Sequence, residues 1–255
     1  MKLLSWNING YRAALKKGFA GFLLKEQPDI IGLQEMKVMR EQLSPEDISL
    51  DGYKLALNSA ERKGYSGVGV FYREEPLSVE TGLGERRFDC EGRLLQLEYP
   101  GFWFVNCYFP QGGRGLERVR YKLEFYDSFL ERIEKLRATG RPVIFCGDVN
   151  TAHKPVDLSH PKNNAGTSGF LPEERAWMDK LEALGWVDTF RVYHPEPLQY
   201  TWWDYKTRAR TRNIGWRLDY FFINKEKISA VRDAYTMPSV MGSDHCPVGV
   251  ELEIK

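Results

Sequence analysis

Short apolar runs recur along the whole chain and are separated by turn residues. Runs rich in β-branched and aromatic residues occur at 2–6, 29–34, 53–57, 67–72, 94–99, 102–109, 142–147, 218–223 and 247–254. Runs of this length and composition are typical of buried β-strands. The pattern therefore predicts a strand-rich protein.

Helical spacing of apolar residues occurs in at least three stretches: the segment that leads up to Lys25, residues 116–140 and residues 172–185. The third stretch begins with Pro172, continues with two glutamates and ends at Gly185, which are favourable residues for the two ends of a helix. About nine strands with so few helices are too many for a repeating strand–helix–strand chain. The count favours two β-sheets packed face to face, with helices on the outside.

Composition places the chain among globular proteins and excludes disordered and fibrous classes. Of its 255 residues, 42% are hydrophobic and 28% are charged, and the mean hydropathy is -0.46. We found no internal repeat and no linker, so we expect one catalytic domain over residues 1–255, with a monomer as the default state. The four cysteines lie far apart in the sequence and are expected to be reduced. Without a signal peptide or a long apolar run, we expect a cytoplasmic protein that does not contact membranes.

The 36 basic and 35 acidic residues give a formal charge of +1, so a polyanion could bind only to a local basic patch. Two segments are locally basic. Their cations are Lys206, Arg208, Arg210, Arg212 and Arg217 in the first, and Arg114, Arg118, Arg120 and Lys122, with Glu117 as the single acid, in the second. A run of charges is usually a solvated surface. The aromatic residues near the first segment favour nucleic acid instead; they are Trp202, Trp203, Tyr205 and Trp216.

Polar residues stand at six strand boundaries. They are Asn7 and Asn9, Glu35, Tyr108, Asp148 and Asn150, Asp219, and Asp244 with His245. Any one of these is explained by an ordinary turn, but the whole set is harder to explain in that way. Because most of the donors are oxygens, the set favours Mg²⁺ or Mn²⁺ over zinc.

Seven segments occur in a recognisable order between residues 5 and 248: SWNINGYR, LQEMK, GYSGVGVFY, NCYFPQGGRG, CGDVNTAH, NIGWRLDYFF and GSDHCPV. Together they resemble the exonuclease III family of abasic-site endonucleases, within the DNase I-like endonuclease, exonuclease and phosphatase superfamily. The resemblance implies a four-layer α/β sandwich of two mixed β-sheets flanked by helices.

The resemblance also implies roles for the residues at the strand boundaries. Glu35 would be the principal Mg²⁺ ligand. The other residues at or near the metal would be Asn7, Asn9, Asp148, Asn150, Asp244 and His245. Asp148 would deprotonate the attacking water, Asn150 would hold that water or a phosphate oxygen, and Asp219 would orient His245 toward the phosphate. Tyr108 would contact the phosphate and is the alternative general base, although a tyrosine with a pKa of about 10 is seldom ionised at pH 7. Some family members carry Asp at the position of Asn9, so we expect weaker Mg²⁺ binding here.

On the DNA side, the resemblance implies a pocket for an extruded abasic sugar, walled by Trp202, Trp216 and Leu218. The expected DNA contacts are Gln111, Arg114, Lys206, Arg208, Arg210 and Arg212. The implied activity is Mg²⁺-dependent cleavage 5′ to abasic sites in double-stranded DNA, accompanied by 3′ to 5′ exonuclease and 3′-phosphodiesterase or phosphatase activity at recessed or blocked 3′ ends. Two alternatives stay open: another phosphoesterase of the same superfamily, or a DNA-binding module without turnover.

Overall fold

A computed structural model describes residues 1–113, 115–196 and 198–254. Arg114, which is expected from the sequence to contact DNA, lies outside the described residues. Within the described part of the chain, no helix is both long enough and apolar enough to cross a membrane.

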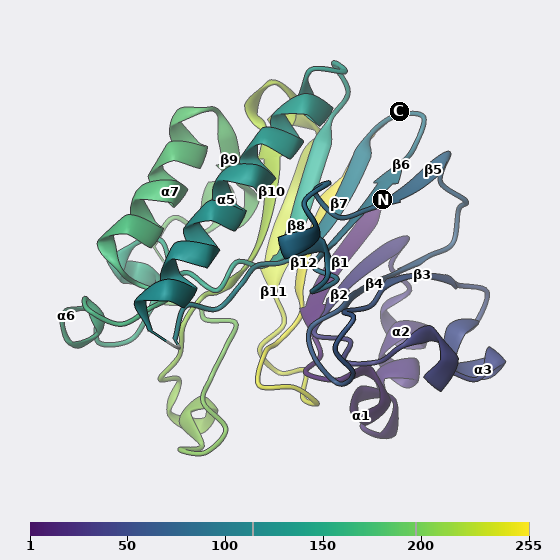
Figure 1. Ribbon diagram of the computed structural model, residues 1–255, viewed down its shortest axis with the longest axis horizontal. Coiled ribbons are helices and arrows are strands. Elements are labelled where there is room, and N and C mark those ends of the chain that lie inside the picture. Colours follow the sequence, from purple (N-terminus) through teal and green to yellow (C-terminus); the bar gives the residue numbers. More distant parts are fainter. Residues whose placement is uncertain (114, 197, 255) are drawn as a thin grey trace.

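Two six-stranded β-sheets form the centre of the molecule (Figure 1). The first sheet contains, in spatial order, β11 (Val231–Thr236), β12 (Val248–Leu252), β1 (Lys2–Asn7), β2 (Ile30–Gln34), β4 (Val68–Tyr72) and β3 (Lys54–Asn58). The second contains β5 (Ser78–Thr81), β6 (Leu94–Glu98), β7 (Trp103–Tyr108), β8 (Val143–Asp148), β10 (Asp219–Asn224) and β9 (Trp186–Asp188). Both sheets are mixed, because the β1–β2 and β7–β8 pairs are parallel and their neighbours are antiparallel. The predicted sandwich of two mixed sheets is confirmed.

Helices cover the outer faces of the two sheets. The longest are α5 (Leu116–Arg137) and α7 (Pro172–Ala183), which lie side by side on the second sheet (Figure 1). The first sheet is covered by α1 (Tyr11–Lys16) and α2 (Phe19–Glu26). The predicted N-terminal helical segment is therefore two helices, since Gly18 between them has a φ of +95° and interrupts the helical path. Short helices complete the layers: α3 (Pro45–Ile48), α4 (Arg86–Asp89), α6 (Pro161–Asn164), α8 (Thr189–Tyr193), and 3₁₀ turns at Arg40–Gln42, Pro155–Asp157, Ala209–Arg212 and Lys225–Ala230.

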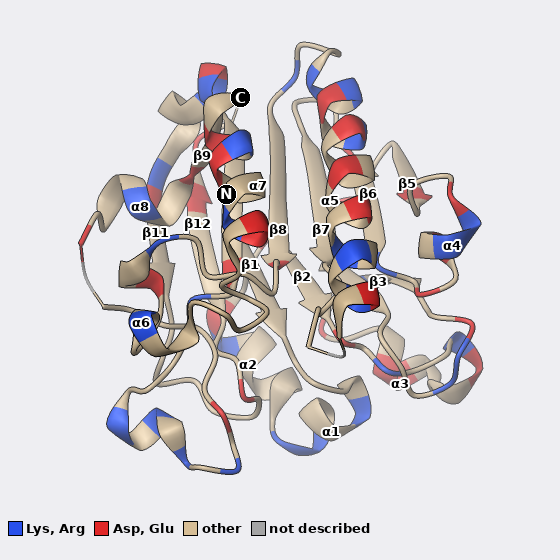
Figure 2. Ribbon diagram, turned by 60° about the vertical axis from the view of Figure 1, so that its left-hand side comes forward, with Lys and Arg blue, Asp and Glu red and all other residues tan. Residues whose placement is uncertain are grey.

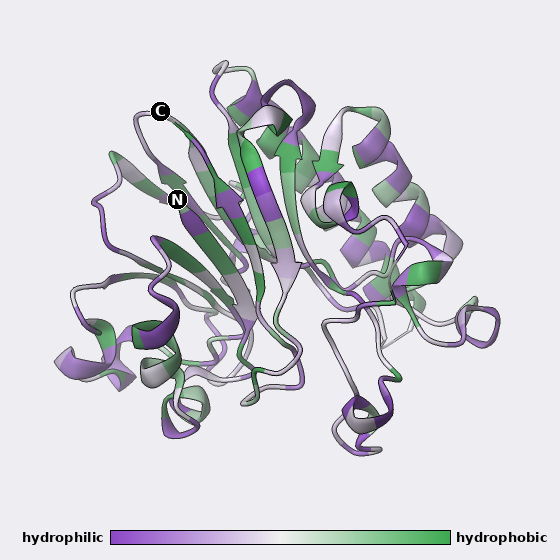
Figure 3. Ribbon diagram, turned by 180° about the vertical axis from the view of Figure 1, so that it is seen from behind, coloured by the Kyte–Doolittle hydropathy of each residue, from purple (hydrophilic) through white to green (hydrophobic). Residues whose placement is uncertain are grey.

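Alternation along the strands builds three apolar layers. Leu3 of β1 faces the space between the sheets, where it joins Phe104 and Ile144, while its neighbour Leu4 packs outward with Phe19 of α2. Figure 3 shows hydrophobic segments concentrated in the strands. Because successive side chains point to opposite faces, a strand covered on both sides must be apolar throughout. This burial explains why the central strands appear in the sequence as continuous apolar runs.

The parallel strands place the candidate chemistry at one end of the sandwich. Asn7 ends β1 and Glu35 directly follows its parallel partner β2. Tyr108 ends β7 and is the register partner of Asp148, which ends β8. Asp219, at the start of the antiparallel β10, lies opposite Asp148. Residues that are far apart in sequence therefore meet at the carboxyl ends of the four parallel strands.

Candidate metal and phosphate site

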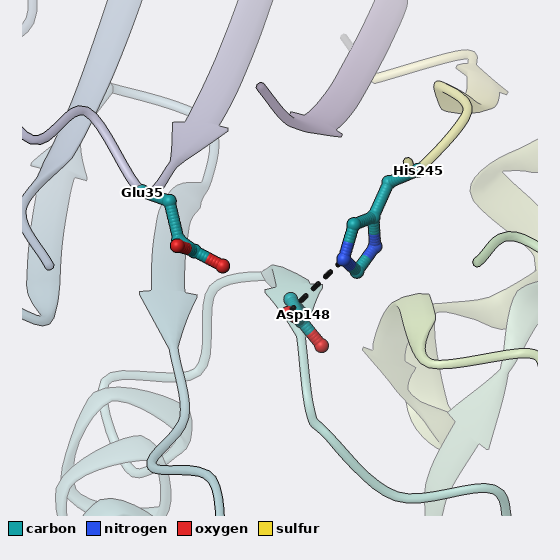
Figure 4. Close-up of side chains that lie close together, drawn as sticks. All are labelled: Glu35, Asp148 and His245. Carbon is teal, nitrogen blue, oxygen red and sulfur yellow. Dashed lines mark ion pairs between the residues drawn. The ribbon is translucent and has the colours of Figure 1, made fainter. Parts of the chain in front are cut away.

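Glu35, Asp148 and His245 point toward one another at the end of the sandwich (Figure 4). One ligand atom from each lies within 4.8 Å of the ligand atoms of the other two. The three side chains come from the loop after β2, the end of β8 and the loop before β12. Two carboxylates at this spacing can hold a divalent cation, and the imidazole is a third ligand in its neutral form.

Asn7 joins the two carboxylates. Its Nδ2 atom donates hydrogen bonds to Glu35 Oε1 at 3.0 Å and to Asp148 Oδ2 at 2.9 Å, and its side chain is fully buried. Its own carbonyl accepts a hydrogen bond of 2.7 Å from Ser243 Oγ, in the loop that carries His245. Asn7 therefore fixes the separation of the carboxylates rather than presenting a free oxygen between them.

Glu35 is held as an anion beside a cation. Burial alone would raise the pKa of its carboxyl, but Lys37, whose Nζ lies 2.6 Å from Oε2, and the hydrogen bond from Asn7 lower it. Lys37 belongs to the LQEMK segment, yet no role was assigned to it from the sequence. An ammonium group at this position shows that the local field favours positive charge.

His245 stands between two carboxylates. Its Nδ1 atom lies 2.8 Å from Asp219 Oδ2, and its Nε2 atom lies 3.8 Å from Asp148 Oδ2. Burial opposes a charged imidazole, but these carboxylates outweigh it and raise the pKa of His245 to about 10. Burial also raises the pKa of Asp148 to about 7, even though His245 acts in the opposite direction. The pair therefore combines a protonated imidazole with a carboxylate that can take up a proton near neutral pH.

Tyr108 keeps its proton at neutral pH. Burial, followed by the charge of Glu35, raises the pKa of its phenol well above the usual value. Its ring lies over the buried guanidinium of Arg93 at 4.6 Å, and Arg93 Nη1 donates to the Tyr108 carbonyl at 2.8 Å. Arg93 was not assigned to the site from the sequence, because an isolated arginine before an apolar run carries no signal there.

Asn9 and Asp244 lie beside the central three residues. Asn9 donates to Asp244 Oδ1 at 2.9 Å and accepts from Lys37 Nζ at 2.6 Å. The second Asp244 oxygen accepts from Trp202 Nε1 at 3.1 Å. Asn150 has a φ of +54°, and its backbone N–H donates to Asp148 Oδ1 at 2.9 Å.

These groups line a cleft of about 980 Å³. One part of its wall is polar and includes Arg62, Tyr65, Glu91, Arg93 and Arg118. Another part is formed by Gly169, Trp202, Trp216 and Leu218, which pack on the buried Leu158 and Phe170. Gln111 also lines the cleft. The structure thus brings the three residues of the expected sugar pocket together beside His245.

The basic segments are less uniform than their sequence indicates. Arg210 donates to the carbonyls of Pro238, Val240 and Ser243 and lies over the ring of the buried Trp203. The prediction that Arg210 faces DNA is therefore revised, because its donors fasten one loop to another. Lys206, Arg208 and Arg212 remain exposed on the loop around Ala209–Arg212, which projects from the body of the molecule in Figure 2.

Two other cations from these segments are buried. Arg217 is 1% exposed and bonds Asp157 and Asp188, while Lys122 is 0% exposed and bonds Glu174. The prediction that they belong to a basic surface patch is wrong, because each forms a buried ion pair with carboxylates that are distant in the sequence.

Residues 4–245 match the model of the Endonuclease/Exonuclease/phosphatase family. The chain belongs to this family. Like its family members, it is a metal-dependent hydrolase of phosphoesters. It is 43% identical to an exodeoxyribonuclease of Bacillus subtilis, with all of both chains covered. It is also 40% identical to a DNA-(apurinic or apyrimidinic site) endonuclease of Dictyostelium discoideum, covering 100% of this chain and 71% of that one. A solved 3′ phosphatase from Neisseria, bound to product DNA hairpin, is 26% identical, covers 99% of each chain and has a TM-score of 0.92.

Proposed function

We propose that this family member is a Mg²⁺-dependent DNA repair nuclease that hydrolyses the phosphodiester 5′ to an abasic site in double-stranded DNA. The observation that carries the proposal is the adjacency of two groups of residues. Glu35, Asp148 and His245 lie in the same cleft as the wall formed by Trp202 and Trp216. The relatives named as an abasic-site endonuclease and an exodeoxyribonuclease support it.

The aromatic wall would select the substrate. A flipped-out sugar without a base is small and apolar enough to stack against rings, whereas a normal nucleotide must be unstacked and then fit its base into the same space. Trp202 is held by its hydrogen bond to Asp244, and Trp202 and Trp216 are joined by an isolated β-bridge. The wall is therefore tied to the loop that carries His245.

The residues present fit a hard divalent cation. Glu35 and Asp148 supply carboxylate oxygens, and His245 lies beside them. The ammonium group of Lys37 already forms an ion pair with Glu35, so a positive charge is favoured at this position. Mg²⁺, or Mn²⁺ in its place, would be held mainly by Glu35 and would neutralise charge on the phosphate during hydrolysis.

Proton movements would be carried out by the second sheet and the loop before β12. Asp148, with a pKa of about 7, would accept the proton of the attacking water. Tyr108 is a poorer base, because its raised pKa keeps the phenol protonated, so it would donate to a phosphate oxygen. His245, oriented by Asp219, would donate a second hydrogen bond from Nε2 to the phosphate. The bond from phosphorus to the 3′ oxygen would break, and that oxygen would take up a proton from solvent water to leave a 3′-hydroxyl and a 5′-phosphate. Asn150 would orient the water or a phosphate oxygen.

Contacts with the DNA backbone would come from the exposed cations of the projecting loop, which are Lys206, Arg208 and Arg212, together with Gln111 at the cleft. These contacts would position the duplex without reading its sequence. The near-neutral charge of the whole chain is compatible with this local surface.

A second activity would use the same catalytic side chains: removal of a phosphate from a blocked 3′ end, and removal of nucleotides from a recessed 3′ end. The similar Neisseria structure is named as a 3′ phosphatase, and a cleft of about 980 Å³ is large enough for a strand end.

One gel experiment tests both activities. Labelled duplexes that carry tetrahydrofuran, a 3′-phosphate or a recessed 3′ end are incubated with the protein in Mg²⁺ and in EDTA. We expect nicking 5′ to tetrahydrofuran in Mg²⁺ and none in EDTA. The Asp148→Asn variant should be inactive, whereas Asp127→Asn, at an exposed carboxylate on α5, should match the wild type. Binding without nicking would instead support a DNA-binding module, and cleavage of the 3′-phosphate alone would support a phosphatase.

A further inference from the structure

A fully buried ion pair joins the two long helices of the second sheet. Lys122 of α5 and Glu174 of α7 are each 0% exposed, and Nζ lies 2.7 Å from Oε1. Neither residue lines the cleft. Both, however, hold loops that do.

Lys122 holds the loop after β8. Its ammonium donates to the Asn150 carbonyl at 2.7 Å and to Thr151 Oγ1 at 2.8 Å. With Glu174, these contacts use all three donors of the ammonium group. Asn150 has a left-handed backbone, with a φ of +54°, which asparagine adopts more readily than most residues other than glycine. A charge-assisted hydrogen bond to its carbonyl holds the loop in this conformation.

Glu174 holds the loop that backs the aromatic wall. Its Oε2 accepts hydrogen bonds from the backbone N–H groups of Gly169 at 2.5 Å and Leu171 at 3.0 Å, and Oε1 accepts one from Ser168 Oγ at 2.9 Å. Gly169 packs so closely on Trp216 that a Cβ there would lie 3.2 Å from the indole ring. The position of Trp216 thus depends on the loop that Glu174 fixes.

The two loops are also joined directly. The Ala152 N–H donates to the Gly169 carbonyl at 2.8 Å. Within the loop after β8, the Tyr126 hydroxyl of α5 contacts both the Val149 carbonyl and Thr151 Oγ1 at 2.8 Å. A shift of either loop would therefore be transmitted to the other.

Stability alone is a weak explanation for this pair. Burying two charges costs desolvation free energy, and well-packed apolar replacements are often equally stable. What an apolar pair cannot supply is directional contact with several backbone groups at once. The geometry of Lys122 and Glu174 provides those contacts on both sides, to Asn150 and to Gly169.

We propose that Lys122 and Glu174 are positioning residues that set the catalytic Asn150 loop in register with the aromatic wall of the pocket. Lys122 acts on the rate of hydrolysis through Asn150. Glu174 acts on the preference for abasic DNA through Gly169 and Trp216. This inference rests on the proposed function, because it assigns the wall to the abasic sugar.

The test compares Lys122→Met and Glu174→Gln with Lys180→Met. The control removes an exposed ion pair, Lys180 with Asp127 at 3.0 Å, between the same two helices. Two readouts are used: the single-turnover rate on a tetrahydrofuran duplex at saturating protein in Mg²⁺, and the ratio of Kd values for intact and tetrahydrofuran duplexes in EDTA. Melting temperatures are measured in parallel, and all assays are run well below them.

We expect Lys122→Met to lower the single-turnover rate by roughly 10²-fold, because small misplacements of catalytic groups have effects of this size. Its preference for tetrahydrofuran DNA should fall by a smaller factor than that of Glu174→Gln, because the Ala152–Gly169 hydrogen bond transmits part of the shift to the aromatic wall. Glu174→Gln places an amide donor against the N–H groups of Gly169 and Leu171, so it should reduce that preference by at least about fivefold. Lys180→Met should change neither quantity.

If the single variants fold poorly, two others replace them. Lys122→Met combined with Glu174→Gln leaves no net buried charge, and Ser168→Ala removes one hydrogen bond to Glu174 without changing charge. A double variant that regains the wild-type melting temperature but not the wild-type rate supports positioning. Wild-type rate and preference in any well-folded variant of the pair would overturn it, leaving a structural role. If the wild type neither incises nor prefers tetrahydrofuran DNA, the proposed function itself fails, and the inference fails with it.

Discussion

The two sheets have the same arrangement of parallel and antiparallel strands but contribute different chemistry. In spatial order, β11-β12-β1-β2-β4-β3 corresponds to β5-β6-β7-β8-β10-β9, with the single parallel pair in the middle of each. β1 and β7 therefore occupy equivalent positions, and so do β2 and β8. In the first sheet, β1 ends in Asn7 and β2 is directly followed by Glu35. In the second sheet, β7 ends in Tyr108 and β8 in Asp148. Equivalent strand ends supply a candidate metal ligand in one sheet and candidate proton-transfer groups in the other.

The ion pairs beside the ends of β2 and β8 also differ, because one is partly exposed to solvent and the others are buried. Beside β2, Glu35 pairs with Lys37, and both side chains are partly exposed, at 18% and 31%. Beside β8, the supporting ion pairs, Lys122 with Glu174 and Arg217 with Asp157, are at most 1% exposed. An exposed pair can be exchanged for a metal or phosphate, while a buried network holds its groups in one geometry. The first sheet therefore suits reversible cation binding, and the second suits fixed orientation.

The largest expected effect follows from breaking the chemistry of the second sheet. Asp148→Asn keeps the shape of the side chain but cannot accept a proton, so kcat on a tetrahydrofuran duplex should fall by about 10³-fold or more. Added Mg²⁺ should not restore it, because the lost function is proton transfer. Steady-state rates over a range of Mg²⁺ concentrations measure both effects. Full recovery at high Mg²⁺ would show instead that Asp148 acts chiefly as a metal ligand.

A stability change of similar size is expected at the buried network. The carboxylate of Asp157 accepts from Arg217 Nε at 2.8 Å and also contacts Arg191, and burial opposed by these two cations leaves its pKa well below the usual range. Asp157→Asn removes one partner of a buried ion pair, so the free energy of unfolding at pH 7 should fall by about 3–5 kcal/mol. Urea denaturation measures the change.

The lowered pKa of Asp157 fixes the sign with which the stability of the fold depends on pH. A depressed carboxyl pKa stabilises the fold above the unfolded-state pKa of about 4, and this contribution is lost as the pH falls toward the folded-state pKa. The difference between wild type and Asp157→Asn should therefore be constant near neutral pH and shrink below about pH 4. The exposed Asp127→Asn should change stability by less than about 1 kcal/mol. A difference that grows in acid would contradict the assignment.

Central strands and strand-end residues could be predicted from the sequence, because burial leaves a continuous apolar run and each run ends in a polar residue. The three strands that were missed, β5, β9 and β11, are all at sheet edges. β5 has three exposed residues among its four, and β9 has only three residues. These three edge strands are short or partly solvated, so they lack the apolar signal of the centre, whereas the fourth edge strand, β3, was predicted from the apolar run at 53–57.

The burial of charged side chains could not be predicted from the sequence, because it depends on partners that are distant along the chain. Lys122 looks like any exposed helix cation until Glu174, 52 residues later, is found beside it. Arg210 is next to true surface cations but bonds carbonyls about 30 residues away. Whether a cation is solvated or buried is decided by tertiary contacts, which a run of charge in the sequence does not encode.

A smaller effect is expected at the strand end of the first sheet. Glu35→Gln keeps the hydrogen bond from Asn7 possible but removes the charge that favours a cation, so the Mg²⁺ concentration for half-maximal activity should rise by at least about tenfold. The matched control is Glu26→Gln, which breaks another carboxylate–lysine pair near the same sheet, with Lys2 at 2.8 Å. An unchanged Mg²⁺ requirement would remove Glu35 from the metal site and make the two strand ends chemically alike.

The smallest effect concerns the exposed loop. Replacing Lys206, Arg208 and Arg212 with glutamine should weaken DNA binding at all sequences and reduce the slope of log K against log salt by about one for each lost phosphate contact. Arg210→Gln should instead lower the melting temperature, because it removes three contacts to backbone carbonyls. In the control, Lys25, Lys135 and Lys225, which do not line the cleft, are replaced with glutamine. The two triple variants have the same net charge, so comparing them separates local DNA contacts from the effect of net charge. Equal slopes in the two triple variants would mean that the loop is only a solvated surface, and that the binding face lies along the polar wall near Arg62 and Arg118.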